Sequence, residues 1–216
     1  MSKNGPFALL FHALVVLFML APLVVVCLVA FTPENTLSLP TTEFSLRWFR
    51  AVFERADFVD AFYNSLILAF CAASLATLIA VPAALAITRF EFPGRDFLNG
   101  LFLSPIIIPH LVLGVALLRL FALMGVNGSF AWLIFAHVLV ITPYVLRLVL
   151  ASAIGLDRSA EHAAQSLGAG RFTLFREITL PMILPGVAGG WLLAFINSFD
   201  EVTLSIFVTS PATQTL

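Results

Sequence analysis

Three polar residues close the last long apolar run of this 216-residue chain: Asn197, Asp200 and Glu201. A carboxylate within or beside a membrane is costly to maintain, so such an acid is a candidate functional residue by default. Asp200 or Glu201 would attract a cation along a substrate path. The alternative is that both acids are solvated where the run meets water. The histidines and the two cysteines show no spacing typical of metal ligands, so we predict no catalytic, cofactor-binding or metal-ligating residue.

The longest charged segment between two apolar runs covers residues 157–186. Ser159 is the predicted N-cap of a helix of small residues that carries Glu161, and Gly168 is predicted to bend the chain after it. Pro181 lets the chain turn into the next apolar run. A second short amphipathic helix is predicted from residues at helical spacing, namely Phe172, Phe175 and Ile178.

Composition defines the class of protein. Hydrophobic residues make up 61% of the chain and the mean hydropathy is +1.05, which indicates a membrane protein. The net charge of −1 gives no support for nucleic-acid binding. The only lysine is Lys3, and a P-loop needs a lysine after its glycines. The chain therefore needs a partner to hydrolyse ATP.

The uncharged runs predict an all-α integral membrane protein with one transmembrane domain, 1–216, and five spans. The expected spans cover residues 8–31, 62–88, 97–120, 130–151 and 182–206. Arginine and lysine placement predicts a cytoplasmic N-terminus, with residues 89–96 and the loop 152–181 also in the cytoplasm. Segments 33–60 and 124–129 then face outward. Prolines make residues 104–110 the most broken part of any span.

The outward segment 33–60 contains one helical stripe, formed by Leu46, Phe49 and Phe53. It predicts a short helix that lies on the membrane surface or packs on the protein. In the last span, a helical wheel puts Asn197 and Asp200 on one face with Gly186 and Gly190, and Glu201 about 100° away. The glycine pair predicts close helix packing.

The 157–186 segment resembles the EAA loop of binding-protein-dependent ABC importer permeases of type I. Seven residues fall in register with that motif over 21 positions: Glu161, Ala163, Ala164, Gly168, Ile178, Leu180 and Pro181. The resemblance implies that they form the coupling helix that docks into a cytoplasmic ATPase, with Glu161 offering a hydrogen bond to a basic group there. The alternative is an amphipathic surface helix that only connects two spans.

The stretch Ser198–Thr203 and its continuation to Pro211 are similar to spermidine/putrescine-type permeases. Two positions depart from that pattern, since Ser210 replaces a glycine and Glu201 replaces the usual aspartate. The resemblance implies a polyamine as the favoured substrate, with phosphonate, opine or ferric ion as alternatives. A channel would leave the Glu161 loop unexplained. A membrane-embedded enzyme would need converging catalytic groups, and apart from the pair Asp200 and Glu201 the spans offer only isolated histidines.

Further expectations follow from this resemblance. The chain would work by alternating access in a bacterial cytoplasmic (inner) membrane, with a homologous second permease subunit, a cytoplasmic ATPase dimer that binds the ATP, and a periplasmic substrate-binding protein. The family usually has six spans, so we expect either a sixth helix missing after Leu216 or a native five-span core.

Overall fold

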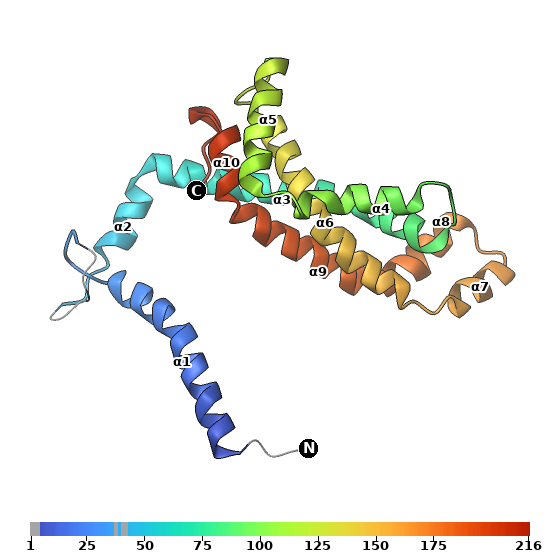
Figure 1. Cartoon of the computed structure of the whole chain (residues 1–216), viewed down its shortest axis with the longest axis horizontal. Coiled ribbons are helices and arrows are strands. Elements are labelled where there is room, and N and C mark those ends of the chain that lie inside the picture. The colour runs from blue at the N-terminus through green and yellow to red at the C-terminus, as the bar shows by residue number, and fades with distance from the viewer. Residues whose placement is uncertain (1–4, 37–38, 40–42) are drawn as a thin grey trace. The chain divides into compact units, whose positions relative to one another are not determined.

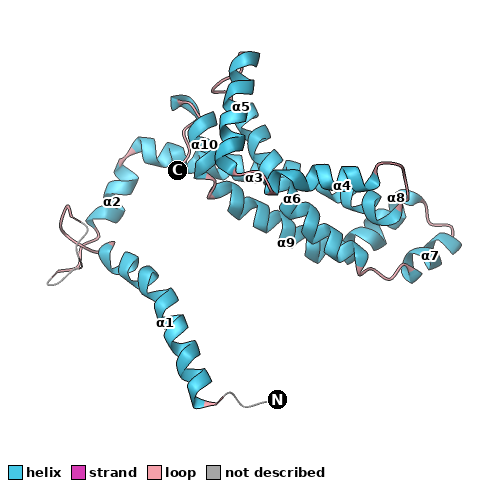
Figure 2. Cartoon of the chain, viewed as in Figure 1, coloured by secondary structure: helices cyan, strands magenta, loops and turns pink. Residues whose placement is uncertain are grey.

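The computed structural model of the chain describes residues 5–36, 39 and 43–216. All regular secondary structure in these residues is helical (Figure 2), so the predicted all-α class is confirmed. Four helices are long and apolar enough to cross a membrane, or five if one strongly bent helix pair counts as a span. The chain divides into two compact units, residues 1–60 and residues 61–216, which are described separately.

The first unit contains helix α1 (Pro6–Val29) and the short helix α2 (Arg47–Glu54). None of the side chains of α1 is buried, as expected for a uniformly apolar helix whose surroundings are lipid or another chain. Helix α2 forms where the stripe of large apolar residues predicts it. The Arg47 side chain donates to the Pro33 carbonyl at 3.1 Å, and its guanidinium lies 5.0 Å from the Trp48 ring centroid, a favourable cation–π distance.

Three long helices build the core of the second unit: α3 (Ala56–Arg89), α6 (Phe130–Ile154) and α9 (Leu180–Phe199). Helix α3 buries a stripe of alanines at helical spacing, which packs with α6 and α9 in one apolar cluster. Small side chains allow helix backbones to approach closely, and this is a common way of packing helices in membranes. Figure 1 shows α6 and α9 side by side along most of their lengths.

The predicted glycine contact lies between α9 and α6. A Cβ on Gly186 would lie 2.0 Å from the Ser152 hydroxyl oxygen and 2.7 Å from the Leu148 carbonyl oxygen. A Cβ on Gly190 would lie 3.2 Å from the Val145 Cα. The prediction of close packing through these two glycines is therefore confirmed.

An aromatic ladder joins α9 to α3 on another face. Trp191 stacks on Phe195, and Phe195 stacks on Phe199, with ring centroids 5.5 and 6.2 Å apart. The Trp191 indole N–H donates to the Ser74 hydroxyl of α3 at 3.2 Å, and Phe62 of α3 meets the Phe199 ring edge to face. These three aromatic residues therefore pack on a neighbouring helix.

The predicted third span is broken, as its prolines indicate. Helix α4 (Arg95–Leu103) continues into the 3₁₀ turn η1 (Ser104–Ile106), and α5 (His110–Met124) follows at an angle of 100°. Pro109 is the N-cap of α5, where its missing N–H removes no helical hydrogen bond. Beyond the bend, α5 packs against the short helix α10 (Val202–Val208) (Figure 1).

The predicted last span differs from the structure. The sequence predicts one helix over 182–206, whereas α9 ends at Phe199 and α10 begins at Val202. The carboxylate of Glu201 accepts the Leu204 N–H at 2.9 Å. It thereby caps α10 and starts a new helix. The short helices α7 (Ser159–Ser166) and α8 (Arg171–Leu174), the π turn η2 (Phe175–Thr179) and the 3₁₀ turn η3 (Pro211–Thr213) complete the fold.

Candidate functional site

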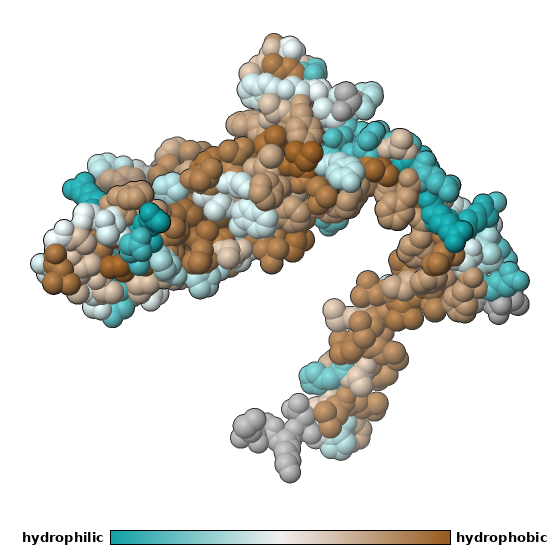
Figure 3. Space-filling view, turned by 180° about the vertical axis from the view of Figure 1, so that it is seen from behind, coloured by the Kyte–Doolittle hydropathy of each residue, from teal (hydrophilic) through white to brown (hydrophobic). Residues whose placement is uncertain are grey.

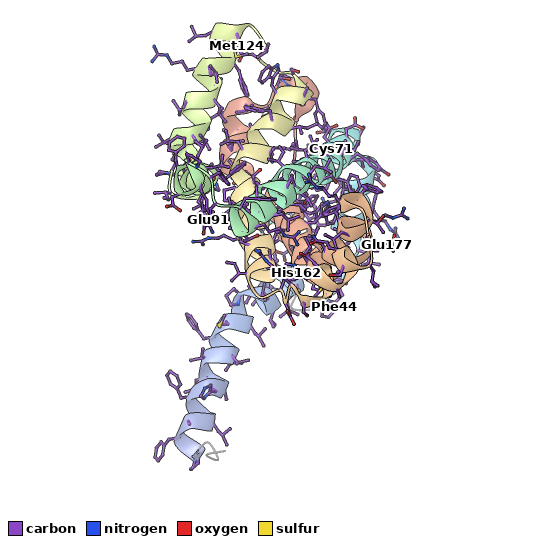
Figure 4. All side chains as sticks on the ribbon, turned by 90° about the vertical axis from the view of Figure 1, so that its right-hand side faces the viewer. Phe44, Cys71, Glu91, Met124, His162 and Glu177 are labelled. Carbon is purple, nitrogen blue, oxygen red and sulfur yellow. The ribbon has the colours of Figure 1, made fainter. Side chains whose placement is uncertain are left out.

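The loop 152–181 lies at one end of the second unit (Figure 1), where α7, α8 and the α3–α4 connection come together. Figure 4 labels one residue from each of the connection, α7 and η2: Glu91, His162 and Glu177. Hydrophilic residues gather at this end, whereas the bodies of the helices are largely hydrophobic (Figure 3). This is the pattern expected where membrane-crossing helices meet water.

The side chain of Asp157, one residue before the N-cap Arg158, binds the first residue of helix α7. Its carboxylate accepts hydrogen bonds from the Ser159 N–H and from the Ser159 hydroxyl, each at 2.9 Å. These bonds, the backbone one first, lower the pKa of the Asp157 carboxyl because they favour its charged form. The predicted N-cap, Ser159, is instead the first helical residue. Asp157 is also a good capping residue two positions earlier, so residue types alone left the choice open.

Gly168 ends α7 as predicted. Its φ is +83°, in the left-handed region that residues with a Cβ seldom adopt. The Gly168 N–H donates to the Gln165 carbonyl at 2.9 Å, and the Ala169 N–H donates to the Ala164 carbonyl at 3.0 Å. This arrangement satisfies carbonyls at the end of the helix and turns the chain toward α8.

Glu161 differs most from the prediction. Its side chain is only 7% exposed, and Arg89 at the end of α3 binds it as an ion pair. The Thr179 hydroxyl, in η2, donates to the same carboxylate oxygen, and the Arg89 guanidinium also donates to Thr179 at 3.3 Å. The expectation that Glu161 reaches outward to a basic group on a partner is therefore wrong for this structure, because the chain supplies that basic group itself.

The Arg89–Glu161–Thr179 network ties three elements together: α3, α7 and the base of α9. A carboxylate that accepts both a guanidinium and a hydroxyl bond within a buried site is held in one position. The network therefore links α7 to α3 and to the turn from which α9 continues.

The rest of the predicted motif falls into two groups. Ala163 is exposed and Ala164 is half-buried on α7, and the large apolar side chains of Leu167 and Phe172 beside them are 89% and 74% exposed. Together these four residues form a surface that we name the α7–α8 face. Its exposed apolar groups are typical of a docking surface.

The second group lies where η2 joins α9. Ile178 is half-buried in η2, and Leu180 and Pro181 form the first turn of α9. The sequence predicts a turn at Pro181, whereas α8, η2 and α9 run on as one helix from Arg171 to Phe199. Pro181 lacks the N–H that would continue an α pattern, and the wider π turn ends two residues before it. Such π turns often mark functional positions in helices.

The acids at the end of α9 separate into different environments. Glu201 is 8% exposed, and its carboxylate lies 2.6 Å from the His110 Nδ1. His110 begins α5 and Glu201 precedes α10. Their contact therefore connects the break before α5 with the break between α9 and α10. His110 does not appear in the predicted site. Its place directly after Pro109, at the break in the third span, was the only sequence signal that could have suggested it.

His137 on α6 contacts both helices that flank the break between α9 and α10. One ring nitrogen lies 2.9 Å from the Ser198 hydroxyl of α9, and the other lies 3.1 Å from the Ser205 hydroxyl of α10. The Ser205 hydroxyl also lies 2.6 Å from the Glu201 carbonyl oxygen, to which it donates. The prediction that the histidines act as polar groups between helices is confirmed for His137 and His110.

Asp200 and Asn197 do not join Glu201. The Asp200 side chain is exposed, and within the described residues it makes no hydrogen bond or ion pair. Asn197 is half-buried, and its side-chain N–H donates to the Leu193 carbonyl at 2.8 Å. The predicted wheel is wrong here, because the glycine face of α9 continues through Ala194 and Ser198 rather than through the two polar residues.

A metal site finds no support in the part of the chain that the structure describes. No group of three or more histidine, cysteine, aspartate or glutamate side chains there could hold a metal ion. Cys27 and Cys71 are both free thiols. Two groups of buried polar side chains therefore remain as candidate sites. They are the Arg89–Glu161–Thr179 network and the contact between Glu201 and His110.

Sequence relatives and solved structures resemble this chain over most of its length. The sequence model of a family described as "Binding-protein-dependent transport system inner membrane component" matches residues 76–216. The spermidine/putrescine transport system permease protein PotC of Escherichia coli (strain K12) is 36% identical over 173 residues, which cover 80% of this chain and 66% of PotC. The putrescine transport system permease protein PotI of the same strain is 34% identical over 208 residues, which cover 92% of this chain and 73% of PotI.

The fold has counterparts among solved structures. A bacterial ABC transporter involved in the import of the acidic polysaccharide alginate matches 99% of this chain and 79% of its own chain, with a TM-score of 0.76 and 13% identity. Another structure of a bacterial alginate ABC transporter, in complex with a pentasaccharide-bound periplasmic protein, gives a TM-score of 0.70 at 16% identity over 97% of this chain and 79% of that one. At such identities the likeness concerns the fold alone. The alignment with PotC spans a little under two thirds of that relative's length.

Proposed function

Since this chain belongs to the family of binding-protein-dependent transport system inner membrane components, we propose that it is a membrane subunit of an ABC importer. It would move a small cationic solute inward by alternating access while a separate ATPase hydrolyses the ATP. The observation that carries the proposal is the Arg89–Glu161–Thr179 network, which connects the α7–α8 face to two core helices. A periplasmic binding protein and a second permease subunit complete the proposed assembly.

The ATPase would dock on the α7–α8 face. The exposed Leu167 and Phe172 side chains offer apolar contact, and Ala163 leaves room for a partner to approach the α7 backbone. ATP-driven closure of the ATPase would then push α7. Glu161 would pass that displacement to α3 through Arg89 and to α9 through Thr179, so that the two helices rock together.

We expect Gly168→Ala to weaken this docking, whereas Gly170→Ala should not. A Cβ at Gly168 costs about 1–2 kcal/mol at its positive φ, whereas Gly170 has a φ of −69°. Neither added Cβ meets another atom within 4 Å, so backbone strain alone distinguishes the two variants. The measurement is the amount of ATPase that co-purifies with each variant. Equal co-purification would show that the bend at Gly168 does not shape the docking surface.

For the substrate we propose a polyamine such as spermidine or putrescine. The support is twofold. The name of PotC contains spermidine and putrescine and that of PotI contains putrescine, and Asp200 presents a carboxylate without a partner among the described residues. Asn197 lies one turn before it and can add a side-chain oxygen as acceptor. Glu201 is already occupied by His110, so it would position α5 and α10 around the path rather than bind the substrate first.

We expect Asp200→Asn to raise the KM for spermidine uptake by about tenfold or more, because a charge-assisted hydrogen bond contributes roughly 1.5–3 kcal/mol. Its unfolding midpoint should match that of the unmodified chain, since Asp200 is exposed. Glu201→Gln serves as the comparison and should lower the midpoint, because it weakens the contact of this buried side chain with His110. An unchanged KM in Asp200→Asn would show that Asp200 does not contact the substrate.

We further propose that the N-terminus and the loop 152–181 face the cytoplasm of a bacterial inner membrane. Single cysteines at Gln165 and Asn127, in a chain lacking Cys27 and Cys71, report the two sides because both positions are exposed. An impermeant maleimide should label Asn127→Cys in intact cells and Gln165→Cys only in inside-out vesicles. Labelling of Gln165→Cys from outside intact cells would reverse the orientation.

A further inference from the structure

A polar pocket of about 450 Å³ lies beside the loop 152–181, and neither site described above uses it. It opens between the end of α3, the start of α4 and the end of α6. Thr88 of α3, Arg95, Asp96 and Asn99 of α4, and Arg158 before α7 supply its polar lining. Its volume falls within the range of about 300–1,000 Å³ typical of ligand sites.

Two of the residues that line this pocket each contain a buried polar atom without a partner. The Arg95 Nε and the Asn99 Oδ1 have no solvent contact and form no hydrogen bond with any described residue. An unsatisfied buried donor or acceptor costs about 1–3 kcal/mol. Neither atom is open to the pocket, so a ligand there would meet other atoms of these two side chains.

The charge of the pocket favours an anion. Arg95 and Arg158 bring two positive charges against the single negative charge of Asp96. The Arg158 guanidinium is held in place because it donates to the Thr88 carbonyl at 2.9 Å. A guanidinium pairs well with phosphate oxygens, to which it can donate two parallel hydrogen bonds.

The position of the pocket suggests where that anion comes from. Ile87, Leu150 and Ile154 form an apolar wall beside the polar groups, and the Ile154 side chain is 75% exposed. These residues lie in the last turns of α3 and α6, which are long apolar helices. A pocket with an apolar wall and a basic rim at the end of such helices matches the two halves of a phospholipid better than a soluble anion.

We propose that this pocket binds the headgroup of an anionic phospholipid. Its phosphate would accept hydrogen bonds from the guanidinium groups of Arg95 and Arg158. Its glycerol backbone and the first part of its acyl chains would lie against Ile87, Leu150 and Ile154. A lipid in this place would brace α4 against α3 and α6 next to the loop 152–181.

The test measures lipid retention by the purified full chain. After delipidation in detergent, the chain is offered phosphatidylglycerol or phosphatidylethanolamine, and bound lipid is counted by native mass spectrometry. We expect phosphatidylglycerol to bind in preference to phosphatidylethanolamine and Arg95→Gln to weaken its binding by about tenfold. The matched control is Arg176→Gln, which removes the same charge from an exposed arginine at the same end and should bind lipid normally.

Three results would overturn the proposal. Equal retention of the two lipids would show that headgroup charge does not determine binding. Normal retention by Arg95→Gln would show that the lipid binds outside this pocket. Displacement of phosphatidylglycerol by millimolar inorganic phosphate would identify a free-anion site instead. Should Arg95→Gln fail to fold, Asn99→Asp provides the same test, because its new carboxylate would repel the phosphate.

Discussion

Replacing Glu161 with alanine should abolish coupled transport. The substitution leaves the Arg89 guanidinium, 21% exposed, without its counter-ion. Breaking a buried ion pair from one side costs roughly 3–5 kcal/mol, and the partial exposure of Arg89 places this pair toward the lower value. Because Glu161 also fixes η2 through Thr179, α7 would lose its connection to both core helices. We expect substrate-stimulated ATP turnover to fall to the unstimulated rate and uptake to fall at least tenfold.

Two companion variants separate coupling from general damage. Glu177→Ala removes an acid of the same type from the same loop, but Glu177 is 63% exposed and pairs weakly with Arg176 at 3.4 Å. It should transport normally. Glu161→Gln keeps an oxygen that can accept from Arg89 and Thr179, so its uptake should lie between those of the alanine variant and the unmodified chain. Full coupling in Glu161→Ala would show that the network does not transmit force.

Adding a single methyl group at Gly186 should destabilise the membrane bundle. The new Cβ would overlap the Ser152 side chain at 2.0 Å and the Leu148 carbonyl oxygen at 2.7 Å. Backbone cannot move aside as a flexible side chain can, so α9 would have to shift away from α6. Overpacking of this kind costs about 1–3 kcal/mol. We expect Gly186→Ala to lower the unfolding midpoint in detergent and to reduce the amount of folded protein in the membrane.

Gly189→Ala is the matched control on the same helix. A Cβ there would meet only the Leu148 Cδ1, at an ordinary contact distance of 3.9 Å, so its midpoint should be unchanged. The double variant Gly186→Ala/Ser152→Gly should recover only part of the loss, because the Leu148 carbonyl remains. Equal midpoints for Gly186→Ala and Gly189→Ala would contradict the close α6–α9 contact.

The sequence was sufficient for features that depend on local chemistry. Charge-free runs identify membrane-crossing helices because the hydrocarbon core sets both their length and their composition. The break near residue 107 follows from Pro105 and Pro109, which cannot continue a helix undisturbed. Gly168 requires a positive φ in a helix-ending bend, so that turn was also predictable.

The partners of the buried acids were not predictable in the same way. Arg89 lies 72 positions before Glu161, and their contact arises only when α3 and α7 meet in the folded unit. The helical wheel of the last span was wrong for a related reason. The wheel assumes one continuous helix, whereas Glu201 contacts His110 and caps a new helix. These sites depend on contacts between residues that are far apart in the sequence. Local periodicity does not indicate such contacts.

The measurement that tests the proposed function most directly is uptake of radiolabelled spermidine into liposomes. They would contain this chain, its partner permease and the ATPase, with loaded binding protein outside and ATP inside. We predict uptake that requires ATP, stops with Glu161→Ala and continues with Glu177→Ala. ATP-independent uptake, or uptake that persists in Glu161→Ala, would contradict this prediction.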